Sequence, residues 1–280
     1  PPDKVHLDGK LHRWGGSGKR DKNSWYCCFA DGIPAGRFGD WRLDLEVTWR
    51  ADVGRSLTSA EQMAHSRRLS ESKKVRDAEM AQKREVASNT VEMIWSKCTG
   101  SEDTHPYLQR KGVKSHGSRV TGDGRLALPL YGEDGSISSL QYISSEGSKQ
   151  FHSGGAVSGK FWTLGSMDDA GPLFIAEGFA TSATVYEVTG RPCVVAYSAS
   201  NMPAVAELMR AKYGAEQEII VVADNDEHGV GQKYADLAND KAGAKVVMPP
   251  ISGDANDYAQ ATSGQDLLDL LMPPSSSIYD

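Results

Sequence analysis

Paired cysteines, long apolar runs and nucleotide-motor loops are all missing from this sequence. Its four cysteines, Cys27, Cys28, Cys98 and Cys193, form no Cys-x-x-Cys pair, and two adjacent cysteines are poorly placed to chelate one tetrahedral ion. We therefore expect reduced thiols and no zinc module. No apolar run is long enough to span a membrane and no signal peptide is present, so we expect a cytoplasmic protein without membrane contact. The absence of a Gly-x-x-x-x-Gly-Lys-Ser/Thr loop excludes an ATP-driven motor in this segment.

Charge is distributed unevenly along the 280 residues. Residues 1–160 hold 25 Lys and Arg against 20 Asp and Glu, a net charge of +5, whereas residues 161–280 hold 6 against 17, a net charge of −11. Cations in the first part suit phosphate groups. Carboxylates in the second part suit metal ions, which invert the local field when bound. The alternative is an uneven surface without a function.

Two carboxylate clusters about fifty residues apart each follow an apolar strand. Glu177 comes at the end of residues 173–178, and Asp224 and Asp226 end residues 219–226. Ligands gather at the carboxyl ends of strands in a parallel α/β sheet, so these three acids are expected to converge. Oxygen-only ligands favour Mg²⁺ or Mn²⁺, so the pattern predicts metal-dependent phosphoryl transfer. The alternatives are a solvated acid at Glu177 and a turn or helix cap at the two aspartates.

Each cluster is followed by a predicted helix, at residues 179–188 and 231–242. This repeated order of strand, acid and helix resembles the Toprim fold shared by primases, topoisomerases and some nucleases, over residues 172–272. After a strand at 244–248, Gly253-Asp-Ala-Asn-Asp257 is similar to the acidic loop of that fold, which implies Asp254 as a further metal ligand. Thr181 and Asn256 stand where DnaG-type members usually have acids, so the resemblance implies fewer ligands for a second metal.

Residues 125–143 predict a hairpin with a Glu-Asp-Gly turn. The hairpin resembles the arginine-led hairpin that precedes Toprim in DnaG-type primases. The resemblance implies that Arg125, Lys149 and Lys160 contact phosphates of nucleotide or template, with ordinary surface cations as the alternative. Together with residues 31–41 and 105–112, the wider pattern resembles the Toprim primases of plasmids and phages, which are commonly the front half of primase–helicase proteins.

Residues 1–55 predict a small β-module of short strands joined by Gly-rich turns. Aromatic residues alternate there with Lys and Arg, as in platforms that stack the bases of single-stranded nucleic acid. The aromatic residues are Trp14, Trp25, Tyr26, Phe29, Phe38 and Trp41. We expect most of them in the core of the module, with Trp14 and Trp25 as the candidates for exposure and base stacking.

Residues 58–98 predict one long helix, opened by a capping box from Thr58 to Glu61. Its apolar stripe is thin, so we expect a spacer; a coiled coil is the alternative, but no sustained heptad supports it. The fold class expected from all segments is α/β, with a Toprim-type Rossmann-like parallel sheet preceded by a primase-type α/β subdomain, a long helix and a small N-terminal β-module. The predicted domains are 1–55 (β-module), 56–98 (helical linker), 99–170 (primase-type subdomain), 171–272 (Toprim catalytic domain) and 273–280 (flexible tail).

The resemblance implies a DNA primase that synthesises short RNA primers on single-stranded DNA by divalent-metal-dependent nucleotidyl transfer. It implies Glu177, Asp224 and Asp226 as catalytic residues, and these three with Asp254 as ligands of Mg²⁺ or Mn²⁺. Expected partners are the single-stranded DNA template, ribonucleoside triphosphates and a replicative helicase, carried in trans or in another part of a longer protein. The alternatives are a Toprim nuclease, which needs the same carboxylates but attacks with water, and a non-catalytic DNA-binding or helicase-loading module.

Overall fold

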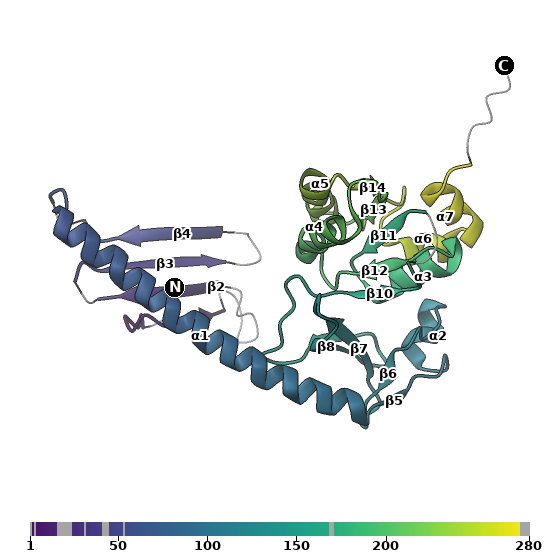
Figure 1. The fold of residues 1–280 in the computed structure, drawn as a ribbon, viewed down its shortest axis with the longest axis horizontal. Coiled ribbons are helices and arrows are strands. Elements are labelled where there is room, and N and C mark those ends of the chain that lie inside the picture. Colours follow the sequence, from purple (N-terminus) through teal and green to yellow (C-terminus); the bar gives the residue numbers. More distant parts are fainter. Residues whose placement is uncertain are drawn as a thin grey trace, which may run out of the picture. The chain divides into compact units, whose positions relative to one another are not determined.

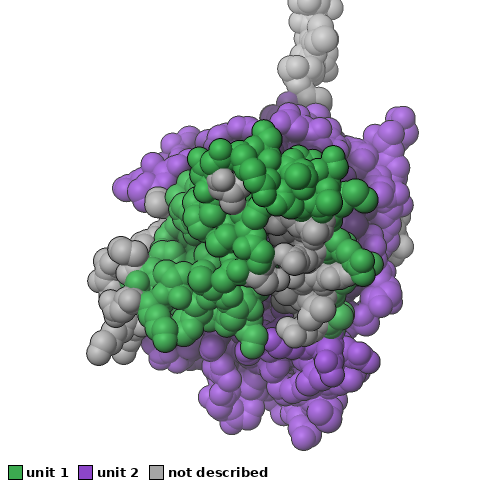
Figure 2. All heavy atoms as spheres, turned by 90° about the vertical axis from the view of Figure 1, so that its left-hand side faces the viewer, with its two compact units in different colours: residues 1–81 green, residues 82–280 purple. Residues whose placement is uncertain are grey.

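The computed structural model describes residues 2, 4–15, 24–30, 32–40, 45–52, 54–167 and 171–274. The chain divides into two compact units, residues 1–81 and residues 82–280 (Figure 2). The boundary falls inside the helix α1 (Ser59–Lys97), which therefore contributes to both units. Among the helices that the structure describes, none is both long and apolar enough to cross a membrane. The predicted platform residue Trp41 and the end of the predicted tail, 275–280, lie outside the described residues.

Unit 1 contains a four-stranded antiparallel sheet with the strand order β1-β2-β3-β4. Its strands are β1 (His12–Trp14), β2 (Ser24–Phe29), β3 (Ala35–Asp40) and β4 (Leu45–Arg50). All four strands lie within the segment 1–55 for which the sequence predicts short strands. Trp25 is 9% exposed, so the prediction of an exposed ring at this position is wrong. Trp14 is half-buried, with its ring 5.6 Å from that of Tyr26.

The predicted long helix and its capping box are confirmed. The Thr58 N–H donates to Glu61 Oε2 (2.9 Å) and the Glu61 N–H donates to Thr58 Oγ1 (3.3 Å), so two backbone donors at the start of α1 are satisfied. Near the other end of α1, Val91 is fully buried in a cluster that includes Ala127 and Leu140. The last turns of the helix are therefore part of the core of unit 2.

Unit 2 begins with a five-stranded antiparallel sheet in the order β5-β6-β7-β8-β9. Its elements are β5 (Thr99–Gly100), the short helix α2 (Pro106–Lys111), β6 (Arg119–Val120), β7 (Leu126–Tyr131), β8 (Ile137–Ile143) and β9 (Lys149–Phe151). Strands β7 and β8 form the hairpin predicted from residues 125–143.

A second sheet follows, with the order β10-β12-β11-β13-β14, and all of its strands except β10 run parallel. Its strands are β10 (Trp162–Leu164), β11 (Leu173–Ala176), β12 (Cys193–Val195), β13 (Ile219–Val222) and β14 (Lys245–Val247). The predicted α/β fold class with a parallel sheet is confirmed.

Helices cover both faces of this sheet (Figure 1). Alternate residues of β11 point to opposite faces, so Leu173 and Ile175 join one apolar cluster and Phe174 and Ala176 join another. The first cluster contains α4 (Met202–Tyr213, after the 3₁₀ turn Ala199–Asn201) and α5 (Val230–Ala242). The second contains residues of α3 (Phe179–Thr189), α6 (Ala255–Ala261) and α7 (Gly264–Leu271).

The two sheets of unit 2 share one apolar core. Leu126, Leu128 and Leu130 of β7 are fully buried in the same cluster as Trp162 of β10 and Phe179 of α3. The rings of Trp162 and Phe179 stack with centroids 5.5 Å apart. This shared core fixes the antiparallel sheet against the N-terminal end of α3, where the first of the predicted acids lies.

Candidate active site

The predicted acids emerge from neighbouring strands at the carboxyl edge of the parallel sheet. Ala176, the last residue of β11, pairs with Val222, the last residue of β13. Glu177 directly follows β11, and Asp224 lies two residues beyond β13. Asp254 caps α6 in the loop after β14. The register of the sheet therefore brings together residues from three separate loops.

Asp224 has the most unusual environment of these acids. Its pKa is raised to about 7, chiefly by burial and next by the charges of Glu177, Asp254 and Asp226, with the Lys149 charge acting in the opposite direction. Its Oδ1 is buried without a hydrogen-bond partner. Burial also raises the pKa of Glu177, against the opposing effects of the Lys149 charge and the Ala199 N–H. For both carboxylates the charge of Lys149 offsets only part of the effect of burial.

Asp226 and Asp254 differ from that pair because both cap helices. Asp226 Oδ1 accepts from the N–H groups of His228 (2.9 Å) and Val230 (3.1 Å), and Oδ2 accepts from that of Gly231 (2.7 Å). These bonds lower the pKa of Asp226. Asp254 Oδ1 accepts from the Asp257 N–H (2.9 Å) at the start of α6. Asp226 therefore bonds both the turn that follows it and the first N–H groups of α5, as the alternative of a turn or helix cap expects, although the N-cap position of α5 itself is Gly229.

The residues at this edge of the sheet offer the oxygen ligands that a hard divalent cation prefers. All four predicted ligands are carboxylates, and the unpartnered Oδ1 of Asp224 is a buried acceptor that a cation would satisfy. As the side chains stand, no three acidic, histidine or cysteine side chains in the described ranges lie close enough to hold one ion. Mg²⁺ is commonly held by one or two carboxylates together with waters and substrate phosphates, so the donor set at this edge does not need three acids on one ion.

Three of the four predicted acids, Asp224, Asp226 and Asp254, line one pocket, which we call the carboxylate pocket. Its volume is about 460 Å³. Its lining residues are Asp224, Asn225, Asp226, Glu227, His228, Ser252, Gly253, Asp254 and Asp257. Glu177 is not among them, although its charge acts on Asp224.

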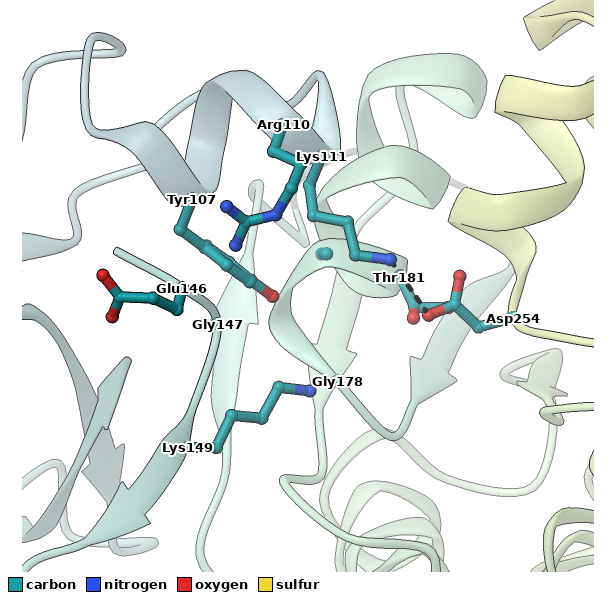
Figure 3. A pocket seen from close by; sticks show the side chains of 10 residues that line it. Tyr107, Arg110, Lys111, Glu146, Gly147, Lys149, Gly178, Thr181 and Asp254 are labelled. Atoms are coloured by element: carbon teal, nitrogen blue, oxygen red, sulfur yellow. Dashed lines mark ion pairs between the residues drawn. The ribbon is translucent and has the colours of Figure 1, made fainter. Parts of the chain in front are cut away.

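A second pocket, which we call the basic pocket, adjoins the first through Asp254 (Figure 3). Its volume is about 300 Å³, and it is lined by Tyr107, Arg110, Lys111, Glu146, Gly147, Lys149, Gly178, Ala180, Thr181 and Asp254. Lys111 Nζ lies 4.0 Å from Asp254 Oδ2 and 3.0 Å from Asp257 Oδ1. A cation thus stands where the two pockets meet.

The three predicted phosphate contacts lie in different places. Lys149 lines the basic pocket, and its ammonium would be 3.4 Å from a Cβ placed on Gly178. Lys149 pairs in register with Ile143 and Ile143 with Leu126, so these three share one face of the antiparallel sheet. Arg125 instead stacks on the ring of Tyr142, 4.5 Å from its centroid, on the opposite face. The structure therefore separates Arg125 from Lys149.

Lys160 also lies outside both pockets. Its ammonium is beside Gly132 in the turn between β7 and β8. Its carbonyl oxygen accepts from Asn201 Nδ2 (2.9 Å), and Asn201 Oδ1 accepts from the N–H of Gly159 (2.7 Å). Asn201 thus connects the backbone around Lys160 to the 3₁₀ turn before α4. The Ala199 N–H of the same turn donates to the Glu177 carboxylate.

Sequence reasoning missed Tyr107, Arg110 and Lys111, although it noted the segment 105–112. Their partners are remote: Lys111 binds Asp257, 146 positions away, and the Lys111 carbonyl accepts from Asn256, 145 positions away. The residues next to Lys111 in the sequence do not predict such long-range contacts. The one available signal was the two adjacent cations just before Gly112.

Comparisons with known proteins find one matching family model and several similar proteins. A family model described as the Toprim domain matches residues 172–265. Two DNA primases TraC of Escherichia coli are similar in sequence: one is 30% identical over 266 residues, covering 90% of this chain and 25% of that protein. The other is 29% identical over 270 residues, covering 91% of this chain and 18% of that protein. The chain thus spans a quarter or less of the length of these relatives.

A solved structure, the primase fragment of the bacteriophage T7 primase-helicase protein, has a TM-score of 0.48 and 16% identity. It covers 86% of this chain, and this chain covers 94% of it. The sequence matches confirm the resemblance to Toprim primases that the motifs indicate.

Proposed function

We propose that this chain, which carries a Toprim domain at residues 172–265, is the catalytic part of a DNA primase that synthesises short RNA primers on single-stranded DNA. The observation that carries the proposal is the group of partly buried acids around Asp224, with its unpartnered Oδ1, beside the ammonium of Lys149. Such a site suits a ligand with both a divalent cation and phosphate groups. The similarity to DNA primases TraC over most of this chain supports the same reaction.

The acids have distinct roles in this proposal. Glu177 and Asp224 hold Mg²⁺ or Mn²⁺, because neither is engaged in a helix cap and both have raised pKa values. Asp226 and Asp254 complete the ligand set from the loops that precede α5 and α6. The bound cations supply charge that stabilises the attacking 3′-oxygen and the leaving pyrophosphate. Glu177, whose pKa burial raises above its usual range, takes the proton of the attacking hydroxyl.

The cations neutralise phosphate charge. Lys149 faces the incoming nucleotide, because it lies in the basic pocket beside the acids. Arg125 and Lys160 lie outside both pockets, Arg125 against Tyr142 and Lys160 beside the turn between β7 and β8, so we assign them to the template strand. Because template contacts are electrostatic, their contribution decreases as salt increases.

Unit 1 is proposed to contribute to template engagement, with half-buried Trp14 as its remaining stacking candidate. A helicase partner is proposed on the sequence resemblance alone. Deleting residues 1–55 tests the first idea: primer synthesis at saturating template should persist, while the template concentration needed for half-maximal rate rises. A truncated protein that needs no more template than the full chain would assign unit 1 another role.

A primer-synthesis assay tests the proposed function. The full chain is incubated with Mg²⁺ or Mn²⁺, labelled ribonucleoside triphosphates and single-stranded DNA, and the products are resolved by length. Template-dependent oligoribonucleotides are the expected result. Loss of template without synthesis would identify a Toprim nuclease instead, and binding without either reaction would identify a non-catalytic module.

A further inference from the structure

Tyr107 carries a hydroxyl that lacks a partner. The residue is 3% exposed, its side chain lines the basic pocket, and its hydroxyl oxygen is buried without a hydrogen bond. Figure 3 shows this hydroxyl pointing into the space between Lys149 and Lys111. Burial raises the pKa of Tyr107 to about 12, so the group is a neutral donor at physiological pH. A buried hydroxyl without an acceptor is costly, and a ligand oxygen in this pocket would remove the cost.

The other donors around the pocket also favour an anion. Arg110, Lys111 and Lys149 contribute three positive charges to its lining, against Glu146 and Asp254. Arg110 Nη1 donates to the carbonyl oxygen of Ser145 (2.9 Å), which fixes the guanidinium at the rim. Asp254 is already compensated by Lys111.

Helix α3 begins at the same pocket. Its N-cap is Gly178, which offers no side chain to the first N–H groups of this eleven-residue helix. Gly178, Ala180 and Thr181 all line the pocket. Uncapped N–H groups and the positive end of the helix dipole favour phosphate oxygens, and they supplement the three cations.

Thr181 makes this arrangement possible. It is 2% exposed and lies in the first turn of α3, at the position where the sequence resemblance indicates an aspartate in DnaG-type members. A carboxylate there would add a third negative charge to the pocket lining. A threonine adds a hydroxyl instead, so in this chain the pocket favours an anion over a second cation.

We propose that the basic pocket binds the polyphosphate of the incoming nucleotide, with the Tyr107 hydroxyl and the start of α3 as donors beside Arg110, Lys111 and Lys149. The proposal rests on the proposed function and adds the site that holds the substrate's phosphates. A volume of about 300 Å³ is at the lower end for small-molecule sites, so it takes phosphate groups and leaves the nucleoside outside. Asp254, shared by both pockets, places these phosphates next to the carboxylate pocket.

Binding of tripolyphosphate to the full chain, measured by calorimetry in EDTA at low salt, tests the proposal without any reaction. Tyr107→Phe removes only the hydroxyl and should weaken binding about tenfold, the usual loss for a hydrogen bond to a charged group. Arg110→Gln should have a similar effect, and Thr181→Asp a larger one. The matched controls are Tyr213→Phe and Lys212→Gln on α4, away from both pockets, and neither should change the affinity by more than about twofold.

Thermal unfolding separates binding from folding. Without ligand, Tyr107→Phe should unfold at the same temperature as the original chain or a higher one, because the lost hydroxyl has no partner. Uridine triphosphate should compete with tripolyphosphate, and uridine should not. Unchanged tripolyphosphate affinity in Tyr107→Phe and Arg110→Gln, or an equal loss in Lys212→Gln, would overturn the proposal.

Primer synthesis by the original chain is measured in a separate assay, so that a failure of the pocket proposal can be distinguished from a failure of the proposed function. Synthesis with no weakening in the pocket variants refutes this pocket and leaves the function standing. The expected losses in tripolyphosphate binding without synthesis support the pocket and refute the function.

Discussion

The carboxylate pocket and the basic pocket adjoin each other at Asp254, yet they are built from different parts of unit 2 and are opposite in charge. The acids follow strands of the parallel sheet, whose register places the ends of β11 and β13 next to each other, so that the charge of Glu177 acts on Asp224. The cations come from α2 and the start of β9, which belong to the antiparallel sheet and its connections. A ligand that combines a metal ion with phosphate groups is therefore complemented only where the two sheets meet.

A second contrast lies inside the carboxylate pocket. Asp224 and Asp226 are two positions apart, but burial raises the pKa of the first to about 7, whereas three backbone N–H groups lower that of the second. Identical side chains thus have different chemistry because one lies inside the sheet edge and the other lies at the start of α5.

The largest effect is expected from Asp224→Asn. It should reduce primer synthesis by about 10³-fold or more, because it removes the least compensated charge of the carboxylate pocket. Synthesis rates at saturating metal and nucleotide measure the loss. Asp240→Asn, an exposed change on α5, is the matched control and should keep full activity. Normal primer yield from Asp224→Asn would remove the acid from the mechanism.

Lys149→Gln removes one positive charge from the lining of the basic pocket. The affinity for nucleotide should fall by about tenfold to a hundredfold, since a charge-assisted contact to phosphate is lost. The metal affinity should hold or rise, because the remaining acids keep their charge and lose a competing cation. Nucleotide and metal titrations of the variant, with Lys212→Gln as control, measure both quantities. Weakened metal binding with intact nucleotide binding would reverse the assignment of Lys149.

Arg125→Gln should have a smaller effect than Lys149→Gln, because Arg125 stacks on Tyr142 on the opposite face of the sheet. At saturating template the synthesis rate should stay within about threefold of the original. At limiting template the loss should increase with salt, as for other electrostatic contacts. Equal nucleotide defects in the two variants would show that the faces of the sheet do not separate their roles.

The smallest expected effect is a shift in stability with pH. An acid whose pKa is raised from 3.8 unfolded to about 7 folded holds its proton more tightly in the folded state, so the fold loses stability as pH rises across this interval. In EDTA at about pH 8, Asp224→Asn should therefore raise the unfolding midpoint by about 2–4 °C, and the difference should vanish near pH 4. Calorimetric scans at both pH values measure it. A constant difference across the range would contradict the raised pKa.

Local patterns in the sequence predicted what local chemistry determines. Strand, acid and helix occur in order around Glu177 and Asp224, and the Thr58–Glu61 capping box opens α1 as expected. The exposure of Trp25 was predicted wrongly, because which ring a small sheet buries depends on its register and not on nearby cations. Tyr107 and Lys111 could not be recognised as site residues, since the pocket that they line also takes residues from 146–149, 178–181 and Asp254.

Tyr197 has a consequence for how this protein can be divided. This buried residue adopts a left-handed backbone conformation (φ 68°) just after β12, and its hydroxyl donates to the Pro129 carbonyl oxygen of β7. A conformation of this kind persists only where surrounding structure enforces it. Residues 172–265 match the family model, but Phe179 within them is buried against the antiparallel sheet, so we expect an excised fragment to expose Phe179 and to be less stable than unit 2. The smallest piece expected to unfold in one cooperative transition begins upstream of the hairpin, within α1.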